Sequence, residues 1–116
     1  MTENKNNGYY VLTKNVEAKQ PYHFVLKASN HETILNSENY TTKDSALNGI
    51  ESVKVNSQDK ENFEIREAKN DEPYFVLIAQ NNKIIATSET YSSMEMCKHG
   101  IDAVIKYASD AIVKGV

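Results

Sequence analysis

The sequence repeats itself. When the chain is compared with itself at an offset of 51 residues, the segment from Phe24 to Val55 aligns with the segment from Phe75 to Lys106. Twelve of these thirty-two aligned pairs are identical, whereas unrelated sequences of average composition agree at about 6% of positions. Two copies are too few for a solenoid, which stacks at least about three repeats. We therefore expect one pseudo-symmetric domain over residues 8–116, built from copy one (residues 8–57) and copy two (residues 61–108).

The clearest local signal in each copy is a β-hairpin. In copy one, apolar and aromatic residues alternate with polar ones over residues 22–28, which favours a strand, and residues 32–38 supply its partner. Asn30-His31 lies between the two strands, and Asn81-Asn82 lies at the same place in copy two. Because asparagine tolerates positive φ angles, we expect a two-residue type I′ turn in both copies.

This pairing assigns side chains to the two faces of the sheet. It places Phe24 and Leu26 toward the core and leaves five branched apolar residues on the opposite face: Val25, Ile34, Val76, Ile78 and Ile85. A solvated face of an antiparallel sheet normally carries polar residues, so this set is a candidate surface for a protein partner. Two alternatives stay open, namely a register slip of one residue, which exchanges the faces, and ordinary strand-forming residues with no partner.

Each copy also predicts a third strand, at residues 8–14 and 62–68, and a helix after the hairpin. The start of each helix is predicted by a hydroxyl residue three positions before a carboxylate, which is the spacing of a capping box: Thr41 before Asp44, and Ser92 before Glu95. After each cap, apolar residues recur at helical spacing and form one stripe, which predicts one buried side per helix: Ala46, Ile50 and Val53 in copy one, and Cys97, Ile101, Val104 and Ala108 in copy two.

Glycines and chain ends complete the expected organisation. Gly49 and Gly100 lie inside the two helices at a cost of about 1 kcal/mol each relative to alanine, which indicates close approach of each helix to the sheet. Residues 109–116 predict either a short edge strand or a tail, and residues 1–7 predict a disordered tail.

Composition excludes several classes of function. With 13 Lys and Arg against 16 Asp and Glu, the net charge is −3, which argues against a broad electrostatic grip on nucleic acid or on an anionic membrane. A single cysteine, Cys97, excludes an internal disulfide and favours a reducing compartment. No apolar run approaches the roughly 20 residues that span a bilayer. We therefore expect a soluble, cytoplasmic protein.

Catalytic and metal-binding patterns are weak. Ser37-Glu38-x-Tyr40 and its repeat Ser88-Glu89-x-Tyr91 could do acid and base chemistry, but a strand end leading into a helix cap accounts for the same residues structurally. The three histidines are scattered and show no ligand spacing, and Cys97 takes the place of Ala46 in an apolar stripe. The glycines form no phosphate-binding loop. We expect no metal and no cofactor.

The repeated residues resemble a known family. The pattern is Asn30, Ile34, Ser37-Glu38-x-Tyr40 and Gly49-Ile50-x-x-Val53, and copy two repeats it. It is similar to the YegP-like family, a bacterial domain family of unknown function, over nearly the whole chain in its tandem-repeat form. The resemblance implies an α+β fold in which two β-β-β-α repeats form one antiparallel sheet of about six strands, with both helices on one face. It brings no activity, substrate or catalytic residue.

Two classes of function follow from these observations. The first is a small non-enzymatic binding or accessory module, acting as a monomer with internal pseudo-twofold symmetry and meeting a protein partner through the open sheet face. The alternative is a small-ligand-binding or enzymatic domain that acts at the strand-to-helix junctions, around Glu38, Tyr40, Glu89 and Tyr91. A binding module should expose a patch, whereas an enzyme should show a concave site with converging titratable groups.

Overall fold

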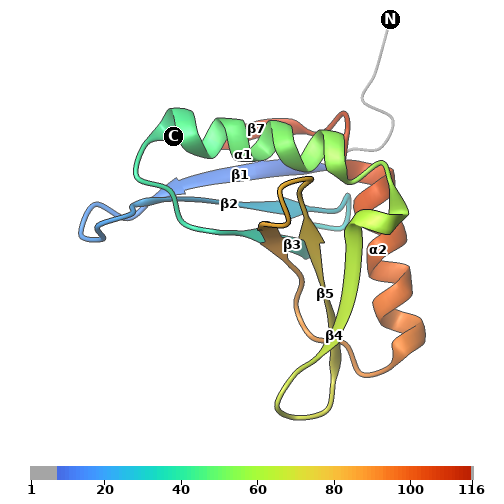
Figure 1. Cartoon of the computed structure of the whole chain (residues 1–116). Helices are drawn as coiled ribbons and strands as arrows, with labels where there is room; N and C mark the ends of the chain where they lie inside the picture. Colours follow the sequence, from blue (N-terminus) through green and yellow to red (C-terminus); the bar gives the residue numbers. More distant parts are fainter. Residues whose placement is uncertain (1–7, 116) are drawn as a thin grey trace, which may run out of the picture.

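The computed structural model describes residues 8–115, so the predicted tail of residues 1–7 lies outside the described residues (Figure 1). The fold is α+β, with one sheet and two α-helices. In chain order the elements are β1 (Tyr9–Lys14), β2 (Tyr22–Lys27), β3 (Thr33–Ser37), α1 (Lys43–Asn56), the short 3-10 helix η1 (Lys60–Asn62), β4 (Phe63–Glu67), β5 (Pro73–Ile78), β6 (Ile84–Thr87), α2 (Met94–Ala108) and β7 (Ile112–Gly115).

The sheet joins the two copies at its centre. Its strand order is β4-β5-β6-β3-β2-β1-β7, and the central pair β3 and β6 brings Asn36 opposite Thr87. These two residues are 51 positions apart, so each faces its own counterpart, as a twofold relation between the copies requires. In Figure 1 the strands of copy one run across the view and those of copy two cross them at a large angle, as expected of a strongly twisted sheet.

The sheet has seven strands and is not purely antiparallel. β7 lies at one edge and pairs in parallel with β1, placing Val113 opposite Tyr10 and Gly115 opposite Leu12. The short edge strand that was one alternative for residues 109–116 is therefore present as β7. It makes the sheet larger than the predicted six strands and its pairing with β1 is parallel, because α2 returns the chain to copy one. Gly115 has a φ of 109°, and a Cβ at this position would collide with the carbonyl oxygen of Leu12. Glycine thus allows β7 to lie against β1.

The hairpin turns are one residue longer than predicted. In copy one the N–H of Ala28 donates to the carbonyl of Glu32, and the N–H of His31 donates to the carbonyl of Ala28, both at 2.9 Å. His31 has a positive φ of 72°, which is typical of a three-residue loop that ends in a left-handed residue, not of a type I′ turn. The same bonds recur around Asp71 and Asn82. The hairpins β2–β3, β4–β5 and β5–β6 therefore use the same turn, whereas β1 and β2 are joined by the longer loop of residues 15–21.

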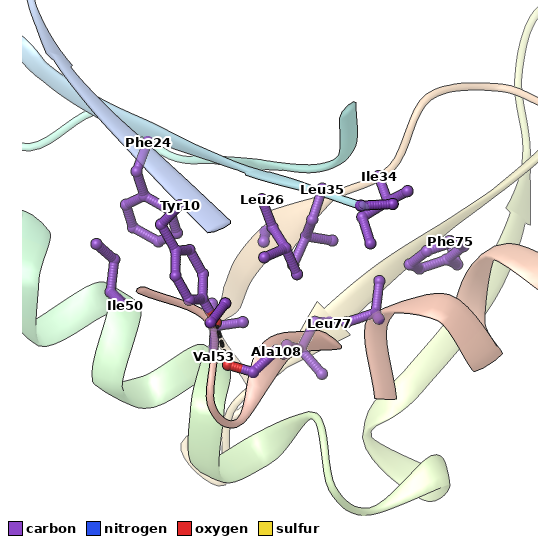
Figure 2. Packing of buried hydrophobic residues seen from close by; sticks show 14 of the residues in the cluster. Tyr10, Phe24, Leu26, Ile34, Leu35, Ile50, Val53, Phe75, Leu77 and Ala108 are labelled. Carbon is purple, nitrogen blue, oxygen red and sulfur yellow. Dashed lines mark hydrogen bonds between the residues drawn. The ribbon is translucent and has the colours of Figure 1, made fainter. Parts of the chain in front are cut away.

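A bulge follows this turn and changes the face of two predicted surface residues. Leu26 pairs with Leu35 but Lys27 pairs with Thr33, so Ile34 is the extra residue. Ile34 is buried in the core, and Figure 2 shows it beside Leu35. In copy two Ile85 is skipped in the same way and packs against the core. The assignment of Ile34 and Ile85 to the outer face is wrong, because the added residue reverses the alternation.

Both helices contribute to one hydrophobic core (Figure 2). Each begins one residue later than the predicted capping box: Thr42 accepts a hydrogen bond from the N–H of Ser45 at 3.0 Å, and Ser93 accepts one from the N–H of Met96 at 3.1 Å. The predicted stripes are buried in both helices. α1 contacts β2, β5 and β6, and α2 contacts β3 and β5. Each helix therefore packs across both copies.

Candidate functional site

The serine of each Ser-Glu-x-Tyr motif holds the end of its hairpin. Ser37 Oγ accepts a hydrogen bond from the N–H of Phe24 at 2.9 Å and donates one to the carbonyl of Glu38 at 2.6 Å. In copy two, Ser88 makes the same two bonds at 2.9 Å and 2.7 Å. Both hydroxyls are thus engaged by backbone groups at the point where the strand leaves the sheet. This arrangement supports a structural account of the repeated serine.

The tyrosine of each motif explains the helical glycines. Tyr40 stacks on Phe24 with ring centroids 6.1 Å apart, and Tyr91 stacks on Phe75 at 6.2 Å. A Cβ on Gly49 would collide with the Tyr40 hydroxyl, and a Cβ on Gly100 with the Tyr91 hydroxyl. The predicted close approach is therefore correct, but the tyrosine ring, together with the phenylalanine beneath it, is what meets the helix. Glycine makes room for the ring.

Each motif tyrosine lies near acidic side chains. Burial raises the pKa of Tyr40, and the nearby Glu38 raises it further. Burial also raises the pKa of Tyr91, with smaller contributions from Cys97, Glu89 and Glu32. The structure therefore brings each tyrosine to the glutamate of its own motif and adds the hairpin residue Glu32 to the pair in copy two. A raised pKa keeps both phenols neutral at physiological pH.

A groove lies between the β2–β3 hairpin and α2. It has a volume of about 630 Å³. It contains Glu89 and Tyr91 of the predicted site but neither Glu38 nor Tyr40. Its wall carries two carboxylates and no lysine or arginine. Ile34, predicted for the outer sheet face, also lines the groove. The lining residues that were not predicted as site residues come from the hairpin and from α2: Ala28, Ser29, Asn30, Glu32, Thr33, Met96, His99, Gly100, Ala103 and Tyr107.

Tyr107 of α2 meets the hairpin in the lining of the groove. Its hydroxyl lies 3.1 Å from Ser29 Oγ, a contact that joins α2 to the hairpin of copy one. The hydrogen bond with Ser29 lowers the pKa of Tyr107, and a Cβ on Gly8 would lie 2.8 Å from the Tyr107 ring. The counterpart of Tyr107 in copy one is Asn56, whose side chain donates to the carbonyl of Ser52 at 2.8 Å within its own helix. The groove is therefore not duplicated in the same form.

The predicted partner surface is smaller and less exposed than expected. After the bulge, the open face retains Val25, Val76 and Ile78 from the predicted set. Val76 is only 2% exposed although it lies outside the core cluster, and Val25 and Ile78 are half-buried. None of these three is among the large hydrophobic residues exposed in residues 8–115. A partner on this face stays a prediction for these three residues.

Other candidate chemistry has little support from the described part of the chain. Within residues 8–115, no group of three or more His, Cys, Asp or Glu side chains is placed to hold a metal ion. Cys97 is buried, as the sequence predicts, and burial raises the pKa of its thiol, which disfavours the reactive thiolate. Within residues 8–115, the helices lack the length and apolar character that a bilayer-spanning helix needs.

Comparison with known proteins identifies the family. The family described as "Domain of unknown function (DUF1508)" matches residues 18–64 and again residues 68–114. The chain belongs to the DUF1508 family. The first match begins just before β2, runs through β3 and α1, and ends in β4. The second begins just before β5, runs through β6 and α2, and ends in β7. The tandem arrangement inferred from self-similarity is thereby confirmed.

The chain is similar to UPF0339 proteins along most of its length. The UPF0339 protein YegP of Yersinia pestis is 45% identical over 92% of this chain and 94% of its own, and UPF0339 protein plu2779 of Photorhabdus laumondii is 50% identical over 92% of both. The solution NMR structure of UPF0339 protein SO3888 from Shewanella oneidensis, 44% identical, covers 94% of this chain and 91% of its own with a TM-score of 0.85. The YegP-like resemblance is correct, and these relatives are uncharacterised.

Proposed function

We propose that this protein is a non-enzymatic binding module whose ligand site is the groove between the β2–β3 hairpin and α2. The observation that carries the proposal is the lining of the groove, in which two carboxylates, Glu32 and Glu89, accompany apolar surface and the imidazole of His99, with no lysine or arginine. A concave site with an apolar floor and a few polar groups is the usual form of a small-ligand site.

The charge of the groove points to a cationic ligand. Glu32 and Glu89 both act electrostatically on Tyr91, so the two carboxylates approach the same phenol from different elements. Glu89 Oε2 also accepts a hydrogen bond from Asn36 at 2.7 Å, which fixes its position. Aromatic faces and carboxylates together favour organic ammonium groups, and Ile34, Met96 and Ala103 offer apolar contact. The ligand class is an organic amine with an apolar portion.

The two copies support this assignment by their difference in charge. At the offset of 51 residues, the counterpart of Glu32 is Lys83, so the equivalent place in the other copy pairs Glu38 with a lysine. Residues 79–81 there line a smaller hollow of about 360 Å³ with Val55 and Asn56. Only the site formed by the copy-one hairpin and α2 combines two carboxylates with the larger volume.

A binding role explains the residues better than catalysis. Both motif serines are occupied by backbone hydrogen bonds, and both motif tyrosines have raised pKa values, so neither supplies a nucleophile or a base near neutral pH. The proposal also includes the packing of both helices on one face of the sheet, which the core shared by the two helices supports. It further includes a site formed by a single chain and a cytoplasmic location.

The test is an NMR titration of the ¹⁵N-labelled full chain with phenethylamine and, separately, with the uncharged 2-phenylethanol. We expect shifts of the amides of Ile34, Glu89 and Ala103 with the amine, and binding at least about tenfold weaker with the alcohol. Glu32→Lys gives the groove the charge of its counterpart and should abolish amine binding. Lys83→Glu is the matched control and should leave binding in the groove unchanged. Equal binding of amine and alcohol, or shifts spread over the whole chain, would overturn the proposal.

A further inference from the structure

The two outer strands of the repeats are equivalent but unequally covered. In copy one, Tyr10 pairs with Leu26 and Leu12 with Phe24. In copy two, Phe63 pairs with Leu77 and Ile65 with Phe75. The outer side of β1 is covered by β7, whereas β4 ends the sheet, and no strand within residues 8–115 pairs with its outer side. The fold therefore has one completed edge and one open edge at equivalent places.

The missing cover is visible in the burial of the neighbouring side chains. Tyr10 and Leu12 are 0% and 1% exposed, while their counterparts Phe63 and Ile65 are only half-buried. A hollow of about 360 Å³ lies beside these two residues and Ile101 of α2, with Lys60 and Lys98 at its rim. In Figure 1, β4 runs beside α2. Apolar surface that copy one buries is thus left accessible in copy two.

We propose that the outer edge of β4, together with Phe63, Ile65 and Ile101, is an acceptor edge that binds an extended peptide segment of a partner protein. The segment lies parallel to β4 and completes the sheet, as β7 does beside β1. Main-chain hydrogen bonds would give affinity and alternate side chains would give specificity, as in other cases of strand addition. This site is separate from the groove and does not depend on the proposed amine binding.

The chain itself supplies the template for the partner segment. β7 turns Val113 to the same side of the sheet as Tyr10, and Ala111 just before it is buried in the core. Gly115 lies opposite Leu12 where a Cβ would collide with the Leu12 carbonyl. A segment that fits β4 in this way carries small aliphatic residues at alternate positions and glycine two positions after the second one. The chemistry of the partner is therefore Ala-x-Val-x-Gly or a close equivalent.

Most of the charge on β4 lies away from this side. Glu64 pairs with Val76 and Arg66 with Tyr74, so these two of its three charged residues lie on the open face, where their side chains form an ion pair at 2.7 Å. The third, Glu67, alternates with Ile65 and comes at the end of the strand, beyond the apolar pair. Charges on an edge strand discourage unselective pairing with other chains. The side of β4 that faces α2 carries Phe63 and Ile65 instead. The ion pair therefore lies on the open face of the edge strand, and apolar side chains are available to a partner segment on the face toward α2.

The experiment uses the full chain, ¹⁵N-labelled, and an acetylated, amidated peptide with the sequence of residues 110–115. We expect shifts of the amides of β4 and of Ile101, and binding at least about tenfold weaker for peptides in which valine is replaced by aspartate, in which glycine is replaced by valine, or in which alternate backbone nitrogens are methylated. The methylated peptide keeps the side chains and removes the donors, so it separates strand addition from unspecific apolar contact.

Variants of the protein locate the site. Ile65→Lys should lose the peptide at least about tenfold, while Glu32→Lys, in the groove, should retain it, so the two proposals can fail separately. Circular dichroism checks that Ile65→Lys is folded, and the milder Ile65→Thr replaces it if it is not. Shifts confined to β1 and β7 would mean that the peptide displaces β7 and would overturn the proposal. A stable dimer that pairs two β4 edges, seen by sedimentation, would overturn it as well.

Discussion

Copy one and copy two agree in their interior and differ at their borders. The serine bonds to the hairpin backbone have the same lengths within 0.1 Å in the two copies, and the tyrosine rings stack at nearly the same distance. The outer strands differ, because β7 pairs with the outer side of β1 and no strand among residues 8–115 pairs with the outer side of β4. The repeated residues therefore maintain the fold, and the places where the copies diverge are where function is to be sought.

The divergence includes the groove as well as the edge. Glu32 and Tyr107 line the groove, whereas their counterparts at the offset of 51 residues are Lys83 and Asn56. The two halves share the packing of their interiors, whereas charge and shape at these surface positions differ between them. A residue that differs between the copies and lines a concavity is thus a better functional candidate than a residue that both copies share.

The largest loss of stability is expected when an apolar side chain of an outer strand is shortened, and it should differ between the two copies. Leu12→Ala removes a side chain that is 1% exposed beneath β7 and should lower the free energy of unfolding by about 3 kcal/mol. Ile65→Ala makes the equivalent change in copy two, where the side chain is half-buried, and should cost about 1 kcal/mol. Urea denaturation followed by circular dichroism measures both. Equal losses would show that β7 adds no protection to copy one.

Substitution of the two helical glycines should have an effect of intermediate size, and the effect should be the same in both copies. Gly49→Ala and Gly100→Ala should each lower the free energy of unfolding by about 2 kcal/mol, because the new methyl group collides with the stacked tyrosine. Intrinsic helix propensity alone predicts a gain of about 1 kcal/mol. Tyr40→Phe combined with Gly49→Ala should recover part of the loss, since the hydroxyl is the nearest atom but a ring carbon remains at 2.7 Å. Stabilisation by either single alanine variant would contradict this account.

Much of the fold could be predicted from the sequence, because the repeat and the periodicity are encoded locally. The helices, the stripes of Ile50 and Ile101, and the pairing of Leu26 with Leu35 all follow from spacing and are present. The bulge at Ile34 could not be predicted from alternation, since one added residue exchanges the faces without changing the composition. A sign was available, because Ala-x-Asn begins all three turns, around His31, Asp71 and Asn82.

Less of the candidate site could be predicted. The Ser-Glu-x-Tyr motif drew attention because it repeats, yet repetition reflects its structural role, and only Glu89 and Tyr91 line the groove. Glu32 and His99 are 67 residues apart and belong to different copies. They share a groove only because the β2–β3 hairpin packs on α2, a contact between copies that no local pattern specifies. The open edge at β4 could not be predicted either, because local patterns do not show that the four-residue β7 pairs with β1 at the opposite edge of the sheet.

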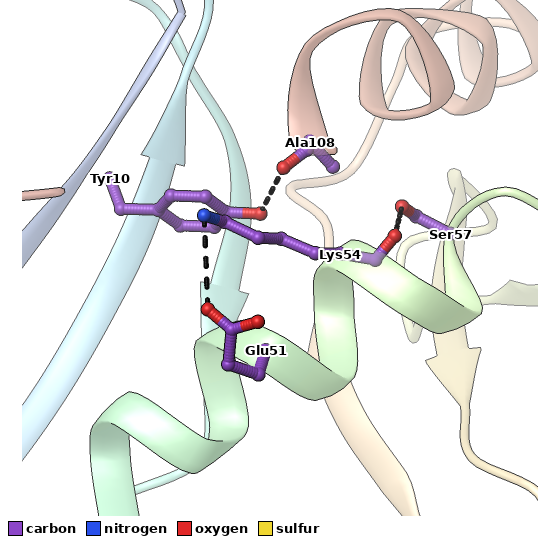
Figure 3. Close-up of polar contacts among 5 residues, drawn as sticks. All are labelled: Tyr10, Glu51, Lys54, Ser57 and Ala108. Carbon is purple, nitrogen blue, oxygen red and sulfur yellow. Dashed lines mark hydrogen bonds and ion pairs between the residues drawn. The ribbon is translucent and has the colours of Figure 1, made fainter. Parts of the chain in front are cut away.

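The hydroxyl of Tyr10 marks a last difference between the outer strands, since the counterpart is Phe63. Figure 3 shows this hydroxyl donating to the carbonyl of Ala108 at the end of α2, at 2.8 Å, with the Lys54 ammonium over the ring. Tyr10→Phe leaves a buried carbonyl without this donor and should lower the free energy of unfolding by about 1 kcal/mol at pH 8. Tyr9→Phe, on the same strand, is the control for a more exposed phenol.

The pH dependence of this loss tests the burial of Tyr10. Burial raises the pKa of Tyr10 well above its ordinary value of 10.0, and Glu51 adds to the effect. A phenol whose pKa is raised in the folded state contributes stability that is complete below about pH 10 and is lost as the pH rises toward the folded pKa, by up to about 1.4 kcal/mol per pH unit. Wild type should therefore lose its advantage over Tyr10→Phe between about pH 10 and pH 11 in urea denaturation. Tyr40 and Tyr91 also have raised pKa values and lower the stability of both proteins alike, so the difference isolates Tyr10. An advantage that stays constant across this range would mean that the Tyr10 phenol ionises as readily in the folded protein as in the unfolded chain.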